Sequence, residues 1–127
     1  MTILLADDNE LNRFVANKLL TRWGYEVLEA VNGTEAILEW IQKKPHLILM
    51  DIQMPVLDGI AATQEIRQKE KEQGLLRTPI IALTADAEQK TYERIIAAGL
   101  DDRIVKPFDP VALRTLIERT IDALRDS

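Results

Sequence analysis

The sequence predicts an α/β fold: a doubly wound, five-stranded parallel sheet built from five βα units, written (βα)5. Two observations predict it. Short β-rich apolar runs alternate five times with longer segments in which apolar residues recur at helical spacing. Three of the runs, at 3–6, 47–50 and 79–83, are continuously apolar, which is typical of strands that helices cover on both faces.

Five strands are expected in chain order. Their ranges are Thr2–Ala6, Tyr25–Ala30, His46–Met50, Pro79–Thr84 and Arg103–Val105. Because parallel strands in one sheet need crossover connections, we expect the intervening helices to run back over the sheet in right-handed crossovers.

The first helix follows the first strand, and its apolar spacing suggests which side faces the core. Leu11, Phe14, Val15 and Leu19 fall on one helical arc, which we expect to be buried. Leu20 falls off that arc, so we expect it to be exposed, with partner docking on this helix as the alternative. The aromatic residues expected in the core or at its edge are Phe14, Trp23, Tyr25 and Trp40.

The later helices show the same spacing and clear start and stop signals. The expected inward residues are Ile37, Trp40 and Ile41, and then Leu113, Leu116, Ile117, Ile121 and Leu124. Asn32–Glu35 and Asp86–Gln89 both fit a capping box, and Asp109 precedes a proline at a first helical position. Gly24, Gly74 and Gly99 follow helical stretches. The polar run 68–73 predicts a solvated helix end.

Composition limits the function classes. A chain of 127 residues is expected to form one domain, 1–127, and it contains no cysteine and a single histidine, His46. Thiol catalysis and multi-histidine zinc sites are therefore excluded. A net charge of −5 argues against direct nucleic-acid binding. No apolar run is long enough to span a bilayer and no signal peptide is evident, so we expect no membrane partner and a cytoplasmic location.

Polar residues stand where the predicted strands end. Asp7 and Asp8 follow the first strand, Asp51 follows the third, Thr84 ends the fourth and Lys106 follows the fifth. The carboxyl ends of parallel strands share one edge of the sheet, and ligands bind there in open α/β sheets. We therefore expect these five side chains to converge into one site.

The expected site suits phosphoryl chemistry. Two carboxylates about 4 Å apart repel by about 4 kcal/mol at an effective dielectric near 20. A hard divalent cation relieves that repulsion, and oxygen-only ligands favour Mg²⁺. A carboxylate beside Mg²⁺ can attack a phosphoryl group, giving an aspartyl-phosphate. Lys106 and the Thr84 hydroxyl could neutralise or hydrogen-bond the transferring group.

With these residues in place, the sequence resembles the receiver domain of two-component response regulators. The stretches that carry the resemblance are Leu4–Glu10, Met50–Gly59, Pro79–Ala85 and Val105–Phe108. The resemblance covers essentially the whole chain and implies the flavodoxin-like strand order 2-1-3-4-5, a known order of this fold. It also implies that Pro55 and Gly59 shape the loop after Asp51, and that the Lys106–Pro107 bond is cis.

The resemblance assigns roles to the site residues. Asp51 is the implied phosphoacceptor, Thr84 hydrogen-bonds the phosphoryl group and Lys106 pairs with it. Asp7, Asp8 and Asp51, with the backbone carbonyl of Gln53, are the implied Mg²⁺ ligands. The chain would catalyse its own phosphorylation and dephosphorylation without being a turnover enzyme.

The resemblance also implies partners. A phosphohistidine on a sensor histidine kinase or a histidine phosphotransfer protein donates, and a downstream protein target reads the changed surface. That surface is expected to include Tyr92, Arg103 and parts of Asp109–Leu124. The alternative is a phosphorelay intermediate that passes the group on to a histidine phosphotransfer protein. The segment 7–13 is similar to receivers attached to hybrid kinases or used in phosphorelays.

One residue departs from the family pattern. Members commonly carry an aromatic residue three positions before the lysine, and this chain has Arg103 there. A guanidinium is costly to bury without partners, so we expect Arg103 to face solvent within the output surface.

Three other function classes fit the sequence less well. A flavodoxin-like electron carrier needs a phosphate loop after the first strand, where 7–10 is acidic. A turnover phosphatase places its nucleophile there, in an Asp-x-Asp pair. A degenerate receiver lacks one of the site residues, and none is missing.

Overall fold

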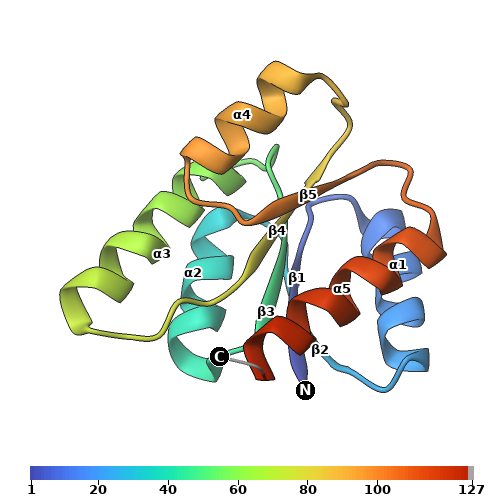
Figure 1. Ribbon diagram of the computed structural model, residues 1–127, viewed down its shortest axis with the longest axis horizontal. Coiled ribbons are helices and arrows are strands. Elements are labelled where there is room, and N and C mark those ends of the chain that lie inside the picture. Colours follow the sequence, from blue (N-terminus) through green and yellow to red (C-terminus); the bar gives the residue numbers. More distant parts are fainter. Residues whose placement is uncertain (126–127) are drawn as a thin grey trace.

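Five strands and five helices alternate along residues 1–125, the part of the chain that the computed structural model describes (Figure 1). The strands are β1 (Thr2–Ala6), β2 (Glu26–Ala30), β3 (Leu47–Asp51), β4 (Ile80–Thr84) and β5 (Asp102–Val105). The helices are α1 (Glu10–Arg22), α2 (Gly33–Lys43), α3 (Gly59–Gln73), α4 (Gln89–Ala97) and α5 (Pro110–Arg125). The predicted (βα)5 order is confirmed.

All strand pairs are parallel, and the strand order is β2-β1-β3-β4-β5, as the resemblance implied. At the carboxyl edge, Ala6 lies beside Met50, and Thr84 lies beside Val105. Asp51 is the last residue of β3, which ends one residue later than predicted, and it pairs with Leu83. The register therefore brings the ends of β1, β3, β4 and β5 to the same edge of the sheet.

Helices cover both faces of the sheet, with α1 and α5 on one side and α2, α3 and α4 on the other (Figure 1). The continuous apolar strands supply both cores. Ile3 and Leu5 pack beneath α1 and α5, whereas Leu4 and Ala6 belong to the opposite core. Burying each such aliphatic side chain contributes about 1.5–3 kcal/mol, so a strand apolar on both faces holds two helical layers.

Helix α1 has the opposite orientation to the one predicted. Leu20 is fully buried, whereas Leu11, Phe14 and Val15 are 69%, 58% and 46% exposed. The expectation that Phe14 packs in the core is wrong for the same reason. The larger apolar side chains of α1 point outward, and the helix packs on the sheet through Ala16 and Leu20. A small residue at the contact lets the helix lie close to the strands.

The cap signals were correct at α2 and α5 but not at α4. Asn32 accepts from the Glu35 backbone N–H (2.8 Å), and Pro110 begins α5 after Asp109. The capping box predicted from Asp86 is wrong, because α4 begins later, with Glu88 at a cap position that makes no side-chain bond. The three predicted glycines all have positive φ, at Gly24, Gly74 and Gly99.

The polar end of α3 is only partly solvated. Glu70 is 6% exposed, which contradicts the prediction for 68–73 as a whole. Its carboxylate accepts from Arg67 Nη1 (2.9 Å) and from the backbone N–H of Thr78 (2.7 Å). A buried carboxylate is retained here because it is paired and hydrogen-bonded.

Within residues 1–125, no helix is long and apolar enough to cross a membrane. The longest, α5, has 16 residues, fewer than the roughly 20 apolar residues that a spanning helix needs. Charged residues also recur along it.

Candidate functional site

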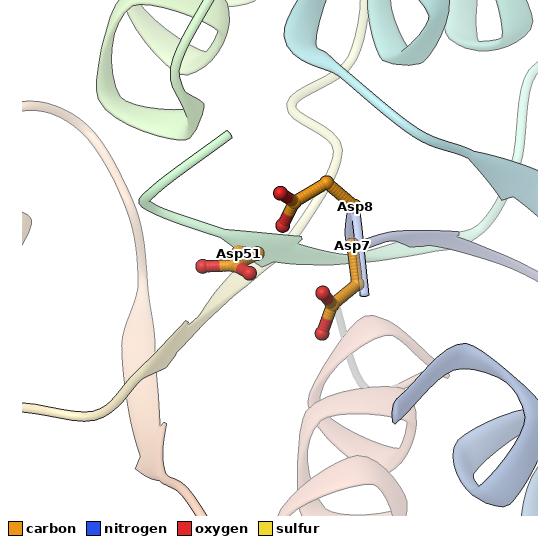
Figure 2. Close-up of side chains that lie close together, drawn as sticks. All are labelled: Asp7, Asp8 and Asp51. Atoms are coloured by element: carbon orange, nitrogen blue, oxygen red, sulfur yellow. The ribbon is translucent and has the colours of Figure 1, made fainter. Parts of the chain in front are cut away.

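Three carboxylates converge at the carboxyl edge of the sheet. We call Asp7, Asp8 and Asp51 the acidic cluster: one ligand oxygen from each lies within 4.8 Å of the others. Figure 2 shows Asp7 and Asp8 on adjacent positions after β1, with Asp51 on the neighbouring strand β3. Asp7 and Asp51 are buried, at 1% and 6% exposure, and Asp8 is exposed. The cluster is therefore open to solvent on the Asp8 side.

Lys106 is the cation of this site. Its Nζ donates to Asp7 Oδ2 at 2.7 Å and to Asp51 Oδ2 at 3.0 Å, and its side chain is 15% exposed. The residue follows β5, its backbone N–H donates to the Thr84 carbonyl (2.7 Å), and the bond to Pro107 is cis as the resemblance implied. One ammonium against three carboxylates leaves the site with a formal charge of −2.

Burial and pairing shift the pKa values of two of these groups. Burial raises the pKa of Asp51 above its ordinary value, and hydrogen bonds from the Gln53 backbone and from Lys106 offset only part of that effect. Burial alone would lower the pKa of Lys106, but hydrogen bonds to Asp7 and Asp51 raise it above the ordinary value. The site thus holds a fully charged lysine beside a carboxylate whose ionisation is disfavoured.

Short side-chain to backbone bonds orient the buried carboxylates. Asp7 Oδ1 accepts from the Asn9 N–H, and Asp51 Oδ1 accepts from the Gln53 N–H, each at 2.9 Å. Such bonds to the residue two positions on are typical of aspartate in turns. They leave the second oxygen of each carboxylate facing Lys106.

Gly59 lets the loop after Asp51 close over this edge. A Cβ at Gly59 would collide with the backbone carbonyl of Asp51, so only glycine fits where α3 begins. The structure agrees with the implied role of Gly59 in shaping this loop.

Thr84 and Gln53 meet the cluster less directly than predicted. The Thr84 hydroxyl, on a residue 2% exposed, accepts from the Asp86 N–H at 3.0 Å and so is engaged within its own loop. Gln53 contributes its backbone N–H to Asp51, while the role predicted for its carbonyl stays a prediction. Thr84 is nevertheless adjacent through the sheet, since it directly follows Leu83, the neighbour of Asp51.

Arg103 avoids the apolar interior, as expected, but is not a free surface side chain. It is half-buried, and its guanidinium donates to the carbonyls of Ala87 (3.1 Å) and Glu88 (2.9 Å). It also lies 5.0 Å from the centre of the Tyr92 ring. Arg103 therefore joins β5 to α4 and to the loop that leaves Thr84.

The donor set fits Mg²⁺. All three side chains offer carboxylate oxygens, the ligand type that this hard cation prefers, and the excess negative charge of the cluster calls for a cation. Asp8 supports the same reading, because its side chain has no hydrogen-bond or ion-pair partner among the described residues. A bound Mg²⁺ would supply neutralising positive charge at the edge of the sheet.

Sequence reasoning did not single out Arg13. Its Nη1 donates to the Asp7 carbonyl (2.9 Å), so it touches the backbone of the acidic cluster from α1. The available signal was the orientation of α1: with Ala16 and Leu20 inward, Arg13 lies one turn before Ala16 on the side facing the sheet. Because the helix was predicted in the opposite orientation, this position was not expected to face the sheet.

Comparison with protein families gives one match across most of the chain. The family model described as the response regulator receiver domain matches residues 3–118. The hybrid signal transduction histidine kinase I of Dictyostelium discoideum is 37% identical over 124 residues, which cover 94% of this chain and 7% of that protein. The transcriptional regulatory protein ResD of Bacillus subtilis is 42% identical over 108 residues, covering 85% of this chain and 42% of that protein. The chain thus spans less than half the length of these two curated relatives.

Two solved structures extend the comparison. One is a co-crystal structure of the Saccharomyces cerevisiae histidine phosphotransfer signalling protein Ypd1 with the receiver domain of its downstream response regulator Ssk1. That match has a TM-score of 0.86 and 33% identity, over 90% of this chain and 83% of the other. The other is the receiver domain of the sensor histidine kinase PA1611 from Pseudomonas aeruginosa PAO1, with a magnesium ion coordinated in the active-site cleft. It has a TM-score of 0.85 and 40% identity, over 95% of this chain and 97% of the other.

Proposed function

The chain belongs to the response regulator receiver domain family of two-component and phosphorelay systems, and we propose that its Asp51 accepts a phosphoryl group from a phosphohistidine. The observation that carries the proposal is the position of Asp51. It lies at the end of β3, within 4.8 Å of two further carboxylates and 3.0 Å from the Lys106 ammonium. No other carboxylate of the cluster combines a strand-end position with an oriented, lysine-bonded oxygen and an adjacent threonine.

In the proposed step, a carboxylate oxygen of Asp51 forms a bond to phosphorus while the bond from phosphorus to the donor imidazole nitrogen breaks. The other nitrogen of the donor ring carries a proton, so the imidazole leaves with that electron pair as a neutral ring. Lys106 then balances charge on the phosphoryl oxygens, and the Thr84 hydroxyl turns from Asp86 to hydrogen-bond one of them. Asp51 must be ionised to attack, so the cation beside it must favour the charged form.

Mg²⁺ is the proposed cofactor, held by Asp7, Asp8, Asp51 and the backbone carbonyl of Gln53. When bound, it would neutralise carboxylate and phosphoryl charge that Lys106 alone cannot balance. The magnesium ion described for the PA1611 receiver domain supports this assignment by similarity. The chain would phosphorylate itself with these groups and would not turn over a separate substrate.

The proposed phosphodonor protein docks on the outward face of α1. That face exposes Leu11, Phe14 and Val15, and α1 begins two residues after Asp8. An apolar face of this kind beside a reaction site is suited to a protein partner that brings its own phosphohistidine to the cluster. The complex described between a histidine phosphotransfer protein and the Ssk1 receiver domain supports this class of partner.

The proposed output surface consists of α4, β5 and α5. Arg103 lies at its centre because it bonds the loop after β4 and stacks on Tyr92 of α4. Turning Thr84 toward a phosphoryl group pulls on the same loop, since the Thr84 hydroxyl accepts from Asp86 two residues on. A phosphorylation-dependent change would thus reach a surface that a downstream protein can read.

The test is direct phosphorylation. We expect incubation with Mg²⁺ and acetyl phosphate to add one phosphoryl mass to the intact chain, and EDTA to abolish the addition. The matched control is Asp51→Asn, which keeps the shape but removes the nucleophile. An unmodified wild type, or equal modification of wild type and Asp51→Asn, contradicts the proposal.

A further inference from the structure

We propose that Arg13 is a positioning residue for the Mg²⁺ site: it fixes the backbone that carries Asp7 and Asp8. The inference rests on the proposed function, because it concerns the same site. Arg13 Nη1 donates to the Asp7 carbonyl at 2.9 Å, while its Nε donates to Glu29 Oε1 at 3.1 Å. One guanidinium therefore joins the acidic loop to strand β2.

The arginine is itself held in place. Its side chain is 16% exposed, and it is paired with Glu29, which lies on the edge strand β2. The other oxygen of that carboxylate, Glu29 Oε2, accepts from Asn17 Nδ2 at 2.9 Å, one turn further along α1. Glu29 is thus fixed by two α1 side chains, and the direction of the Arg13 fork is set before any ligand arrives.

Holding the Asp7 carbonyl determines where the next carboxylate points. The Asp7 N–H donates to the Ala30 carbonyl at 3.0 Å, so this residue is fixed to β2 on its amino side. The bond from Arg13 fixes its carbonyl side and hence the plane of the peptide that leads into Asp8. The Asp8 side chain has no partner of its own among residues 1–125, so its direction depends on that backbone.

Charge and position make opposite predictions for this residue. A guanidinium beside an acidic cluster repels a second cation, so by Coulomb interaction alone its removal would tighten Mg²⁺ binding. If Arg13 instead orients the ligands, its removal weakens binding although the site becomes more negative. Residues that orient metal ligands through hydrogen bonds typically change metal affinity 10–100-fold when mutated.

The experiment is a Mg²⁺ titration of the 127-residue chain by calorimetry, at fixed ionic strength. We expect Arg13→Met to weaken Mg²⁺ binding, raising the dissociation constant by roughly tenfold or more. Arg13→Lys keeps the charge but cannot hold two acceptors in fork geometry, so we expect it to weaken binding as well. Unchanged or tighter Mg²⁺ binding in either folded variant overturns the inference.

A second readout needs no metal. In EDTA, we expect the amides of Asp8 and Asn9 to exchange with solvent faster in Arg13→Lys than in the wild type, at matched global stability. Glu29→Gln is the control for the support of Arg13, and we expect a smaller loss of Mg²⁺ affinity from it. If the wild type binds Mg²⁺ and the Arg13 variants bind it equally well, this inference fails and the proposed function stands. A wild type that takes up no Mg²⁺ overturns both.

Discussion

Charged side chains gather at both ends of the sheet, and the two groups are built differently. At the carboxyl edge, the acidic cluster and Lys106 set three carboxylates against one ammonium. At the amino edge, Arg67, Glu70, Arg77 and Asp101 set two guanidinium groups against two carboxylates, and we call these four the arginine cluster. The first group carries a formal charge of −2, and the second is neutral.

Most of the charged groups in the arginine cluster have hydrogen-bond partners. Arg67 donates from Nη1 to Glu70 Oε1 and the Thr78 carbonyl, from Nε to the Gly99 carbonyl, and from Nη2 to Asp101 Oδ2. Asp101 Oδ2 also accepts from the Ile80 N–H at 2.8 Å. These bonds join the end of α3 to the beginnings of β4 and β5, so every charge has a structural use.

The acidic cluster shows the opposite balance. Asp8 has no side-chain partner among residues 1–125, and the pKa of Asp51 is raised by burial. Charges arranged to hold a fold are paired, whereas charges arranged to hold a ligand stay under-compensated until it binds. The difference between the two edges is thus a physical argument for function that does not depend on family resemblance.

The largest expected effect lies in the arginine cluster. Arg67→Met removes the guanidinium that bonds Glu70 and Asp101, and Glu70 is 6% exposed. Removing one partner of a buried ion pair typically costs 3–5 kcal/mol, and we expect a loss of about 3 kcal/mol in the free energy of unfolding by urea denaturation.

Arg77→Met is the matched control, because Arg77 bonds the same Asp101 but its side chain is 56% exposed. We expect a loss below about 1 kcal/mol. Equal losses from the two arginine variants would mean that the burial of the guanidinium does not decide how much it stabilises the fold.

The acidic cluster is expected to respond in the opposite sense. Because the pKa of Asp51 is raised, the folded protein binds this proton more tightly than the unfolded chain does. The stability it contributes is present at low pH and is lost as pH rises through the folded pKa. In EDTA at pH 7, we therefore expect Asp51→Asn to be more stable than the wild type, by roughly 1 kcal/mol.

The measurement is a pair of urea titrations of wild type and Asp51→Asn in EDTA, between about pH 4 and pH 8. The advantage of the Asn variant should grow with pH, and saturating Mg²⁺ should shrink it by stabilising the wild type. An Asn variant that is the less stable protein in EDTA at pH 7 would show that the metal-free acidic cluster is not under electrostatic strain.

The same contrast explains what the sequence could predict. Strand ends were placed within one residue because continuous apolar runs mark buried parallel strands, and four side chains of the site follow from those ends. The sheet topology brings together the strand ends that carry Asp7, Asp8, Asp51 and Lys106. The roles of residues at neighbouring strand ends can therefore be predicted from the sequence.

The roles of residues that hydrogen-bond to carbonyls outside their own helix could not be predicted from the sequence. Arg13 donates to the carbonyl of Asp7, and Arg67 donates to the carbonyls of Gly99 and Thr78. Every residue has a backbone carbonyl, so the sequence does not indicate which ones accept these bonds. The prediction of which side of α1 faces the sheet was wrong for a related reason. The outward arc with Phe14 is richer in large apolar residues than the inward arc, so apolar spacing favoured the wrong face. An exposed apolar face, here the one proposed to receive the phosphodonor, resembles a core-facing side when only apolar spacing is considered.

The smallest expected effect on stability separates the two clusters most cleanly. Asp8→Asn changes an exposed side chain that has no partner among residues 1–125, so we expect the metal-free stability to stay within about 0.5 kcal/mol of the wild type. The same carboxylate-to-amide change at Asp101 weakens bonds to two arginines and should cost about 1.5 kcal/mol. With Mg²⁺ the ranking should reverse: Asp101→Asn keeps the full stabilisation by Mg²⁺, and Asp8→Asn loses most of it, as thermal denaturation with and without EDTA would measure. An Asp8 variant that keeps that stabilisation would mean that the unpaired carboxylate is not a ligand, because a charge that neither holds the fold nor binds the cation has no place in the site proposed at this edge.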